Sequence, residues 1–186
     1  MSFINSFRKS AKNLSKITPI CVCSMMLALR IVLGIFTNFT LSFMPFVKIG
    51  FSFLPIVIVA YLYGPVCAAV VSSVGDILSI IMSNPTGFSI MPGITLCYFF
   101  EGFILGCVLY EQKISIARIS VAFALVLVLC RLPLNTLVLH LVMGIPYLEL
   151  LMYRSIVLIP FAVVEILLSL AILKALAKVP MLNKLR

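Results

Sequence analysis

Six long apolar stretches follow one another along the chain, separated by short segments rich in polar residues, glycine or proline. A helix of about 20 predominantly apolar residues is long enough to cross the hydrocarbon core of a bilayer. The six stretches cover residues 17–36, 51–63, 66–82, 94–110, 116–143 and 147–175. We therefore predict an all-α integral membrane protein whose six transmembrane helices form a single membrane domain over residues 1–186.

The second stretch, residues 51–63, is shorter than the others and is followed directly by Gly64 and Pro65. Pro55 lies near its start, where it caps or distorts a helix. Because this helix is short for a bilayer, we expect its neighbours in the protein, rather than lipid, to surround it.

The composition supports a membrane protein and excludes a soluble one. Apolar residues make up 63% of the chain and charged residues 10%, against about 45–50% and about 25% in an average soluble domain. A water-soluble core of this size could not bury so much apolar surface. The six stretches also leave no room for a catalytic domain outside the membrane.

The net charge of +9 follows the positive-inside rule. If the N-terminus is in the cytoplasm, ten basic residues lie on the cytoplasmic side. They lie in the two tails (residues 1–16 and 176–186), in the cytoplasmic loops and at the ends of the adjoining apolar stretches. The outer loops hold only Lys48. We predict a multi-pass membrane protein with cytoplasmic N- and C-termini. No basic face with interleaved aromatic residues is present, so the expected surroundings are the lipid bilayer, with no nucleic acid partner.

Motifs for catalysis or metal binding are missing from the sequence. The six cysteines lie in apolar stretches without a C-x-x-C pair or a spacing suited to zinc. There is no phosphate-binding loop and no H-E-x-x-H helix. We predict that the protein is not an enzyme, binds no metal and uses no cofactor, so that any ATP-driven transport requires separate subunits.

Six charged residues lie at membrane depth, away from the ends of the apolar stretches that hold Arg118, Glu149 and Lys174, and a charge at this depth costs roughly 2.5 to 3.5 kcal/mol on insertion scales. They are Arg30, Asp76, Glu101, Arg131, Arg154 and Glu165. Such residues face either a ligand cavity or a partner of opposite charge, and the sequence leaves both possibilities open: Asp76 or Glu101 could simply neutralise Arg131 or Arg30. Arg154 and Glu165 are about three helical turns apart and cannot pair with each other.

Arg131 and Asn135 provide the most suggestive pair of polar groups. Their i, i+4 spacing places them on one helix face, and Pro133 between them weakens the helical hydrogen-bond ladder. A guanidinium and an amide together suit an anionic or heteroaromatic ligand, although they could also join two helices. Ser24 and Ala28 form a small-xxx-small face that can admit a partner helix.

Several short motifs resemble the folate branch of the substrate-binding S components of energy-coupling factor (ECF) transporters. They are M-L-A-L-R-I-V-L-G at 26–34, K-I-G-F-S-F-L-P-I-V-I-V-A-Y-L-Y-G-P-V at 48–66, V-G-D-I-L at 74–78, N-P-T-G-F at 84–88, P-G-I-T-L at 92–96 and L-N-T-L-V-L at 134–139. The resemblance implies a six-helix protein that binds folate from outside, joins a transmembrane coupling subunit and two ATPase subunits, and topples in the bilayer to release its substrate.

The resemblance also implies roles for individual segments and residues. The loops at residues 37–50 and 83–93 would cover the pocket, and the face around Ser24 and Ala28 would meet the coupling subunit. The expected substrate-binding residues are Arg131, Asn135, Glu101, Asp76, Arg30 and Lys48. Among these, Glu101 and Asn135 would recognise the pterin, Arg131 would be a charge partner or ligand contact, and Lys48 or Arg30 would hold the glutamate tail.

Two departures from the family pattern keep other functions open. P-G-I-T-L stands where relatives have P-G-F-T-L, and Glu101 stands where other residues are usual. The alternatives are an S component for riboflavin, pantothenate or a queuosine precursor, a stand-alone proton-coupled carrier that uses Asp76 or Glu101 as a relay, and a membrane assembly protein.

Overall fold

The structure, a computed structural model, describes residues 10, 16–37, 39–40, 48–83, 92–110, 112 and 114–178. Its helices are α2 (Ile17–Thr37), α3 (Phe53–Tyr63), α4 (Pro65–Ser83), α5 (Pro92–Leu109), α6 (Ile116–Val126), η1 (Leu127–Leu134), α7 (Asn135–Met143) and α8 (Tyr147–Ala177). Two short strands, β1 (Phe39–Thr40) and β2 (Lys48–Ile49), pair antiparallel within the segment expected to be a loop. Phenylalanine, threonine and isoleucine favour extended backbone, which accounts for this difference.

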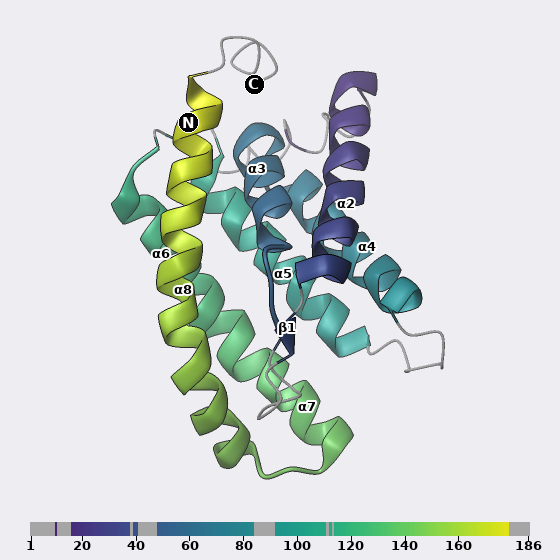
Figure 1. Ribbon diagram of the computed structural model, residues 1–186, viewed down its shortest axis with the longest axis vertical. Helices are drawn as coiled ribbons and strands as arrows, with labels where there is room; N and C mark the ends of the chain where they lie inside the picture. Colours follow the sequence, from purple (N-terminus) through teal and green to yellow (C-terminus); the bar gives the residue numbers. More distant parts are fainter. Residues whose placement is uncertain are drawn as a thin grey trace.

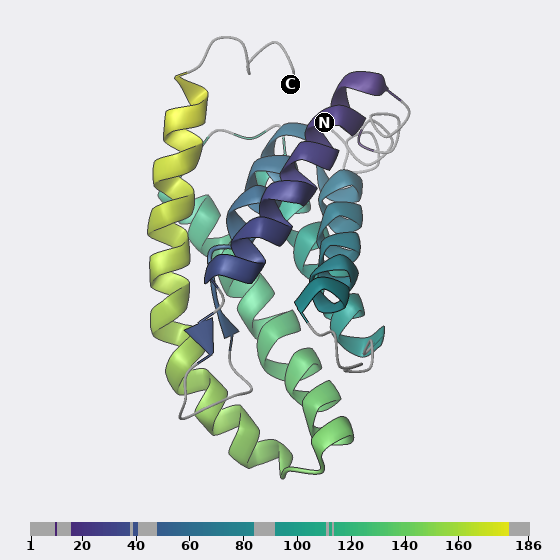
Figure 2. The same cartoon turned by 45° about the vertical axis from the view of Figure 1, so that its right-hand side comes forward.

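The helices form an elongated up-and-down bundle (Figures 1 and 2). The start of α2 and the end of α8 lie at one end of the bundle, and the turn between α7 and α8 forms the other end. In the described part of the chain, five segments are long and apolar enough to cross a membrane: α2, α4, α5, the continuous run from α6 to α7, and α8. We refer to the end that holds the α7–α8 turn as the loop end.

Helix α3 lies at the centre of the bundle, in contact with α2, α4, α5 and α8. Ten of its eleven residues are buried. At its start, the ring of Phe53 makes edge contacts with Phe123 of α6 and Phe161 of α8, at centroid distances of 6.0 and 6.4 Å. The prediction that this short helix is sheltered by its neighbours is confirmed.

The chain turns sharply between α3 and α4 at Gly64, whose φ of 88° is favourable only for glycine. Ser10, from the segment before α2, is fully buried against this turn. Its hydroxyl donates to the carbonyl oxygen of Tyr63 (2.7 Å) and accepts from the backbone N–H of Val66 (3.1 Å). These bonds satisfy backbone groups that the helix break leaves without helical partners.

The predicted weakening of the helix around Pro133 takes the form of a π-helical segment, η1. Proline has no backbone N–H to donate, so the regular i to i−4 ladder is interrupted there. The N–H of Asn135 bonds instead to the carbonyl oxygen of Cys130, five residues earlier. This wider turn, a geometry often found at functional sites, contains Arg131.

Candidate functional site

A polar cavity of about 140 Å³ lies among the helices, with contributions from α2 to α5, η1, α7 and α8. All six charged residues that the sequence places at membrane depth line it, so they share one cavity. The lining residues are Arg30, Gly34, Gly50, Ser52, Phe53, Ile56, Asp76, Ser79, Ile80, Tyr98, Glu101, Arg131, Asn135, Arg154, Leu158, Phe161 and Glu165.

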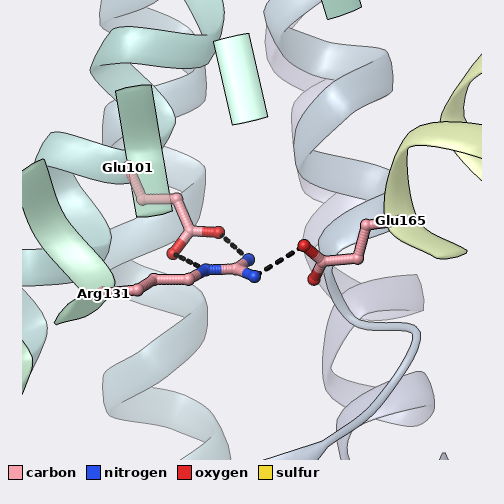
Figure 3. A network of polar contacts seen from close by, with 3 residues as sticks. All are labelled: Glu101, Arg131 and Glu165. Atoms are coloured by element: carbon pink, nitrogen blue, oxygen red, sulfur yellow. Dashed lines mark hydrogen bonds and ion pairs between the residues drawn. The ribbon is translucent and has the colours of Figure 1, made fainter. Parts of the chain in front are cut away.

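Three of these residues, Glu101, Arg131 and Glu165, form an ion-pair cluster across the cavity (Figure 3). The guanidinium of Arg131 lies between the two carboxylates, with Nη2 2.5 Å from Oε1 of Glu101 and Nη1 2.6 Å from Oε2 of Glu165. A longer bond of 3.4 Å joins Nε to Oε2 of Glu101. The side chains are only 13%, 5% and 2% exposed for Arg131, Glu101 and Glu165.

With both acids ionised, one guanidinium between two carboxylates gives the cluster a net charge of −1. Arg131 is therefore a charge partner, one of the two roles expected for it, and its guanidinium is already engaged. Glu165 was not among the expected substrate-binding residues, although its position within an apolar stretch had marked it as a buried charge. Hydropathy indicates how deep such a residue lies in the membrane, but it does not indicate which neighbouring helix provides its partner.

Arg30 is held differently, without a carboxylate within ion-pair distance in the described part of the chain. Its side chain, in a residue only 4% exposed, reaches from α2 to α4, where Nη1 donates to the backbone carbonyls of Val71 and Ser72. The guanidinium lies 5.2 Å from the ring centroid of Tyr98 on α5, a cation–π distance. Gly75 makes room for it, because a Cβ there would lie 2.7 Å from Nη1.

Arg154 of α8 is a second arginine without a carboxylate partner among the described residues. It is 6% exposed, and its Nη1 donates to Oδ1 of Asn135 at 3.2 Å, while its Nε has no hydrogen-bond partner. The expected site did not include Arg154. A spacing of eleven residues is almost three full helical turns, so Arg154 lies on the same face of α8 as Glu165, and this spacing was the available signal.

The remaining expected residues are placed as follows. Asp76 lines the cavity and accepts a hydrogen bond from the Thr95 hydroxyl at 2.9 Å. Asn135 also lines it, so Arg131 and Asn135 do share one cavity. The backbone of Lys48 pairs with Thr40 in the β1–β2 hairpin, but its side chain lies outside the described residues, as do residues 41–47 and 84–91 of the two expected covering loops.

Ser24 and Ala28 both lie on the exposed side of α2. Arg30 on the same helix is buried and points into the bundle, whereas these two residues are exposed. The small-residue face is therefore separate from the cavity and open to a partner.

Comparison with known proteins identifies the family. The sequence profile of the substrate-specific components of ECF transporters matches residues 19–177. This chain belongs to that family. As an S component, it is a multi-pass membrane protein of a transport system. The predicted all-α membrane fold is confirmed by the match to a solved structure. The orientation of the termini is still a prediction.

Two relatives carry the name FolT. The folate transporter FolT of Clostridium novyi (strain NT) is 30% identical over 131 residues, which are 70% of this chain and 73% of that protein. A crystal structure of FolT bound with folic acid superposes with a TM-score of 0.74 at 25% identity, and the match covers 83% of this chain and 91% of that one. The S component described here is therefore similar to these proteins in both sequence and fold.

Proposed function

We propose that this S component is the folate-binding subunit of an ECF-type importer in the bacterial cytoplasmic membrane. The observation that carries the proposal is the polar cavity, which presents both cations and anions inside a fold similar to that of FolT bound with folic acid. Folate is itself amphoteric, because its pterin ring donates and accepts hydrogen bonds and its glutamate tail carries two carboxylates. A cavity lined only by apolar groups could not solvate either end.

In this proposal the Glu101–Arg131–Glu165 cluster binds the pterin. Arg131 occupies one side of each carboxylate, and each carboxylate oxygen has two lone-pair sites, so acceptor capacity is left for other donors. The amino group and ring N–H of a pterin are donors of the required type. Asp76 and the amide group of Asn135 would complete the polar wall, with Arg131 acting as the charge partner that keeps Glu101 in place.

The glutamate tail would lie nearer the loop end of the cavity, in contact with Arg30 and Lys48. Arg30 is seven residues before Thr37, the last residue of α2, and so about 10 Å from that end of the helix. Glu165 is eighteen residues after Tyr147, about 27 Å along α8 from the loop end. Arg30 lies in the half of α2 nearer the loop end (Figures 1 and 2), and this supports placing the tail on that side.

Delivery of the substrate requires partners. We propose that the exposed Ser24 and Ala28 face of α2 contacts a transmembrane coupling subunit, which in turn works with two ATPase subunits. Small residues allow two helix backbones to approach closely in a membrane. The whole chain would act as one membrane domain with cytoplasmic termini.

Ligand binding by the purified protein in detergent tests the proposal. Titration calorimetry with folic acid, riboflavin and pantothenate should give tight binding for folic acid alone. Glu101→Gln should weaken folic acid binding by about tenfold or more, because it removes a charged acceptor, whereas Glu149→Gln, an exposed carboxylate on α8, should have no effect.

Two results would contradict the proposed function. One is preferential binding of riboflavin or pantothenate, which would assign another vitamin. The other is accumulation of folate in vesicles that contain this chain alone and are driven only by a pH gradient, since an S component requires its coupling and ATPase subunits.

A further inference from the structure

The three arginines of the cavity differ in how their charges are compensated. Arg131 has two carboxylates, whereas neither Arg30 nor Arg154 has a carboxylate within ion-pair distance in the described part of the chain. Both are more than nine-tenths buried. A buried charge without a counter-charge is costly, so its presence beside a cavity indicates an anion that arrives from outside.

Arg154 is the less satisfied of the two. Arg30 donates to two backbone carbonyls and lies over the ring of Tyr98, whereas Arg154 makes a single described hydrogen bond, from Nη1 to Oδ1 of Asn135. Its Nε is buried and has no partner. The edge of the guanidinium formed by Nε and Nη2 therefore makes no hydrogen bond with described residues, and a guanidinium edge of this kind can bind a carboxylate through two parallel hydrogen bonds.

Asn135 determines how this edge is presented. Its side-chain oxygen holds Nη1 of Arg154 from the first turn of α7, directly after the π-helical segment. An amide at this position orients the guanidinium without cancelling its charge, whereas an aspartate would neutralise it. Asn135 is thus a positioning residue for Arg154.

We infer that Arg154, oriented by Asn135, binds a carboxylate of the substrate. The inference rests on the proposed function, since the glutamate moiety of folate supplies carboxylates at one end of the ligand. Arg154 is seven residues after Tyr147, about 10 Å along α8 from the loop end. Arg30 comes from α2, which ends well before the loop end (Figures 1 and 2), so Arg154 is the arginine nearer that end of the cavity.

Binding of folic acid and of its dimethyl ester tests this inference, because the ester keeps the pterin and the shape of the tail but has no carboxylate. Arg154→Gln should weaken folic acid binding by about tenfold to a hundredfold and leave binding of the ester nearly unchanged. Lys174→Gln removes an exposed charge from the same helix and is the matched control. Equal weakening of both ligands by Arg154→Gln overturns the inference.

A second variant examines the role of Asn135. Asn135→Asp places a carboxylate against the guanidinium of Arg154 and should weaken folic acid binding more than it weakens binding of the ester, because the ester has no carboxylate for Arg154 to bind. If Asn135→Asp binds folic acid as the wild type does, the inference is overturned. A wild-type protein that binds neither ligand contradicts the proposed function, and the inference with it.

The melting temperature of the ligand-free protein separates binding from a structural role. Arg154→Gln removes an uncompensated buried charge, so the ligand-free variant should melt at or above the wild-type temperature, while the increase caused by folic acid becomes smaller. A ligand-free variant that melts several degrees below the Lys174→Gln control shows that Arg154 stabilises the fold, and overturns the inference.

Discussion

Replacement of Arg131 by methionine is expected to destabilise the protein strongly. The substitution leaves the carboxylates of Glu101 and Glu165 inside the bundle without their shared cation, and these side chains are only 5% and 2% exposed. Removal of one partner from a buried ion pair costs about 3 to 5 kcal/mol. For a chain of this length, that range corresponds to a decrease of about 6 to 20 °C in melting temperature.

The same reasoning predicts that the loss is recovered when the carboxylates are removed as well. The triple variant Glu101→Gln, Arg131→Met, Glu165→Gln has no charge left in the cluster and should melt within a few degrees of the wild type. Glu165→Gln alone leaves a neutral Arg131–Glu101 pair, and should cost about 1 kcal/mol, the value of one hydrogen bond. The order of the melting temperatures thus shows whether uncompensated charge or lost packing causes the destabilisation.

A thiol-reactive fluorescent dye can record these melting curves in detergent. Four cysteines are buried and become reactive only on unfolding: Cys23, Cys67, Cys97 and Cys130. Cys21 is exposed, so the measurements use a Cys21→Ser background to lower the initial signal. If Arg131→Met and the triple variant melt at the same temperature, uncompensated charge is not the cause of the loss, and the reasoning is refuted.

Three further substitutions test close contacts in the bundle. Gly106→Ala should cost more than 2 kcal/mol in thermal unfolding, because its Cβ would overlap the backbone of Pro65 at the start of α4. Gly144→Ala, in an open turn at a φ of 69°, should cost about 1 kcal/mol, and equal costs for the two variants would contradict the close approach at Gly106. Ser10→Ala should cost about 1 to 2 kcal/mol by the loss of two hydrogen bonds at the α3–α4 turn, and Ser155→Ala, whose hydroxyl bonds only within its own helix turn, should have almost no effect. Gly75→Ala should displace the guanidinium of Arg30, which packs against Gly75, and should weaken folic acid binding about tenfold in calorimetry. Unchanged affinity would show that Arg30 does not contact the ligand.

Hydropathy was sufficient to locate the helices because, in a membrane, the length of an apolar stretch is fixed by the thickness of the hydrocarbon core. The same physical limit identified α3 as the sheltered helix, since eleven residues cannot span that thickness. Pro133 likewise marked the place where the helical ladder fails. These predictions each depend on one local property of the chain.

The pairing of the charges depends on several helices at once and was less accessible. The sequence showed that Arg131 lies at mid-membrane, but helix rotation decides that both Glu101 and Glu165 face it. Arg154 was recognised as a buried charge without being assigned to the site, because its hydrogen bond to Asn135 appears only when α7 and α8 are placed together. The role of Lys48 is still a prediction, since its side chain lies outside the described residues.

The central position of α3 has a consequence for membrane insertion. Eleven residues of helix rise about 16 Å, roughly half the thickness of the hydrocarbon core, so α3 alone would leave backbone groups without partners in lipid. Three of the helices that cover it, α4, α5 and α8, are synthesised after it, and α8 ends only at Ala177. During biogenesis, α3 must therefore wait at the insertion machinery or against α2 and α4, and it becomes fully enclosed only when the last helix of the chain has entered the membrane.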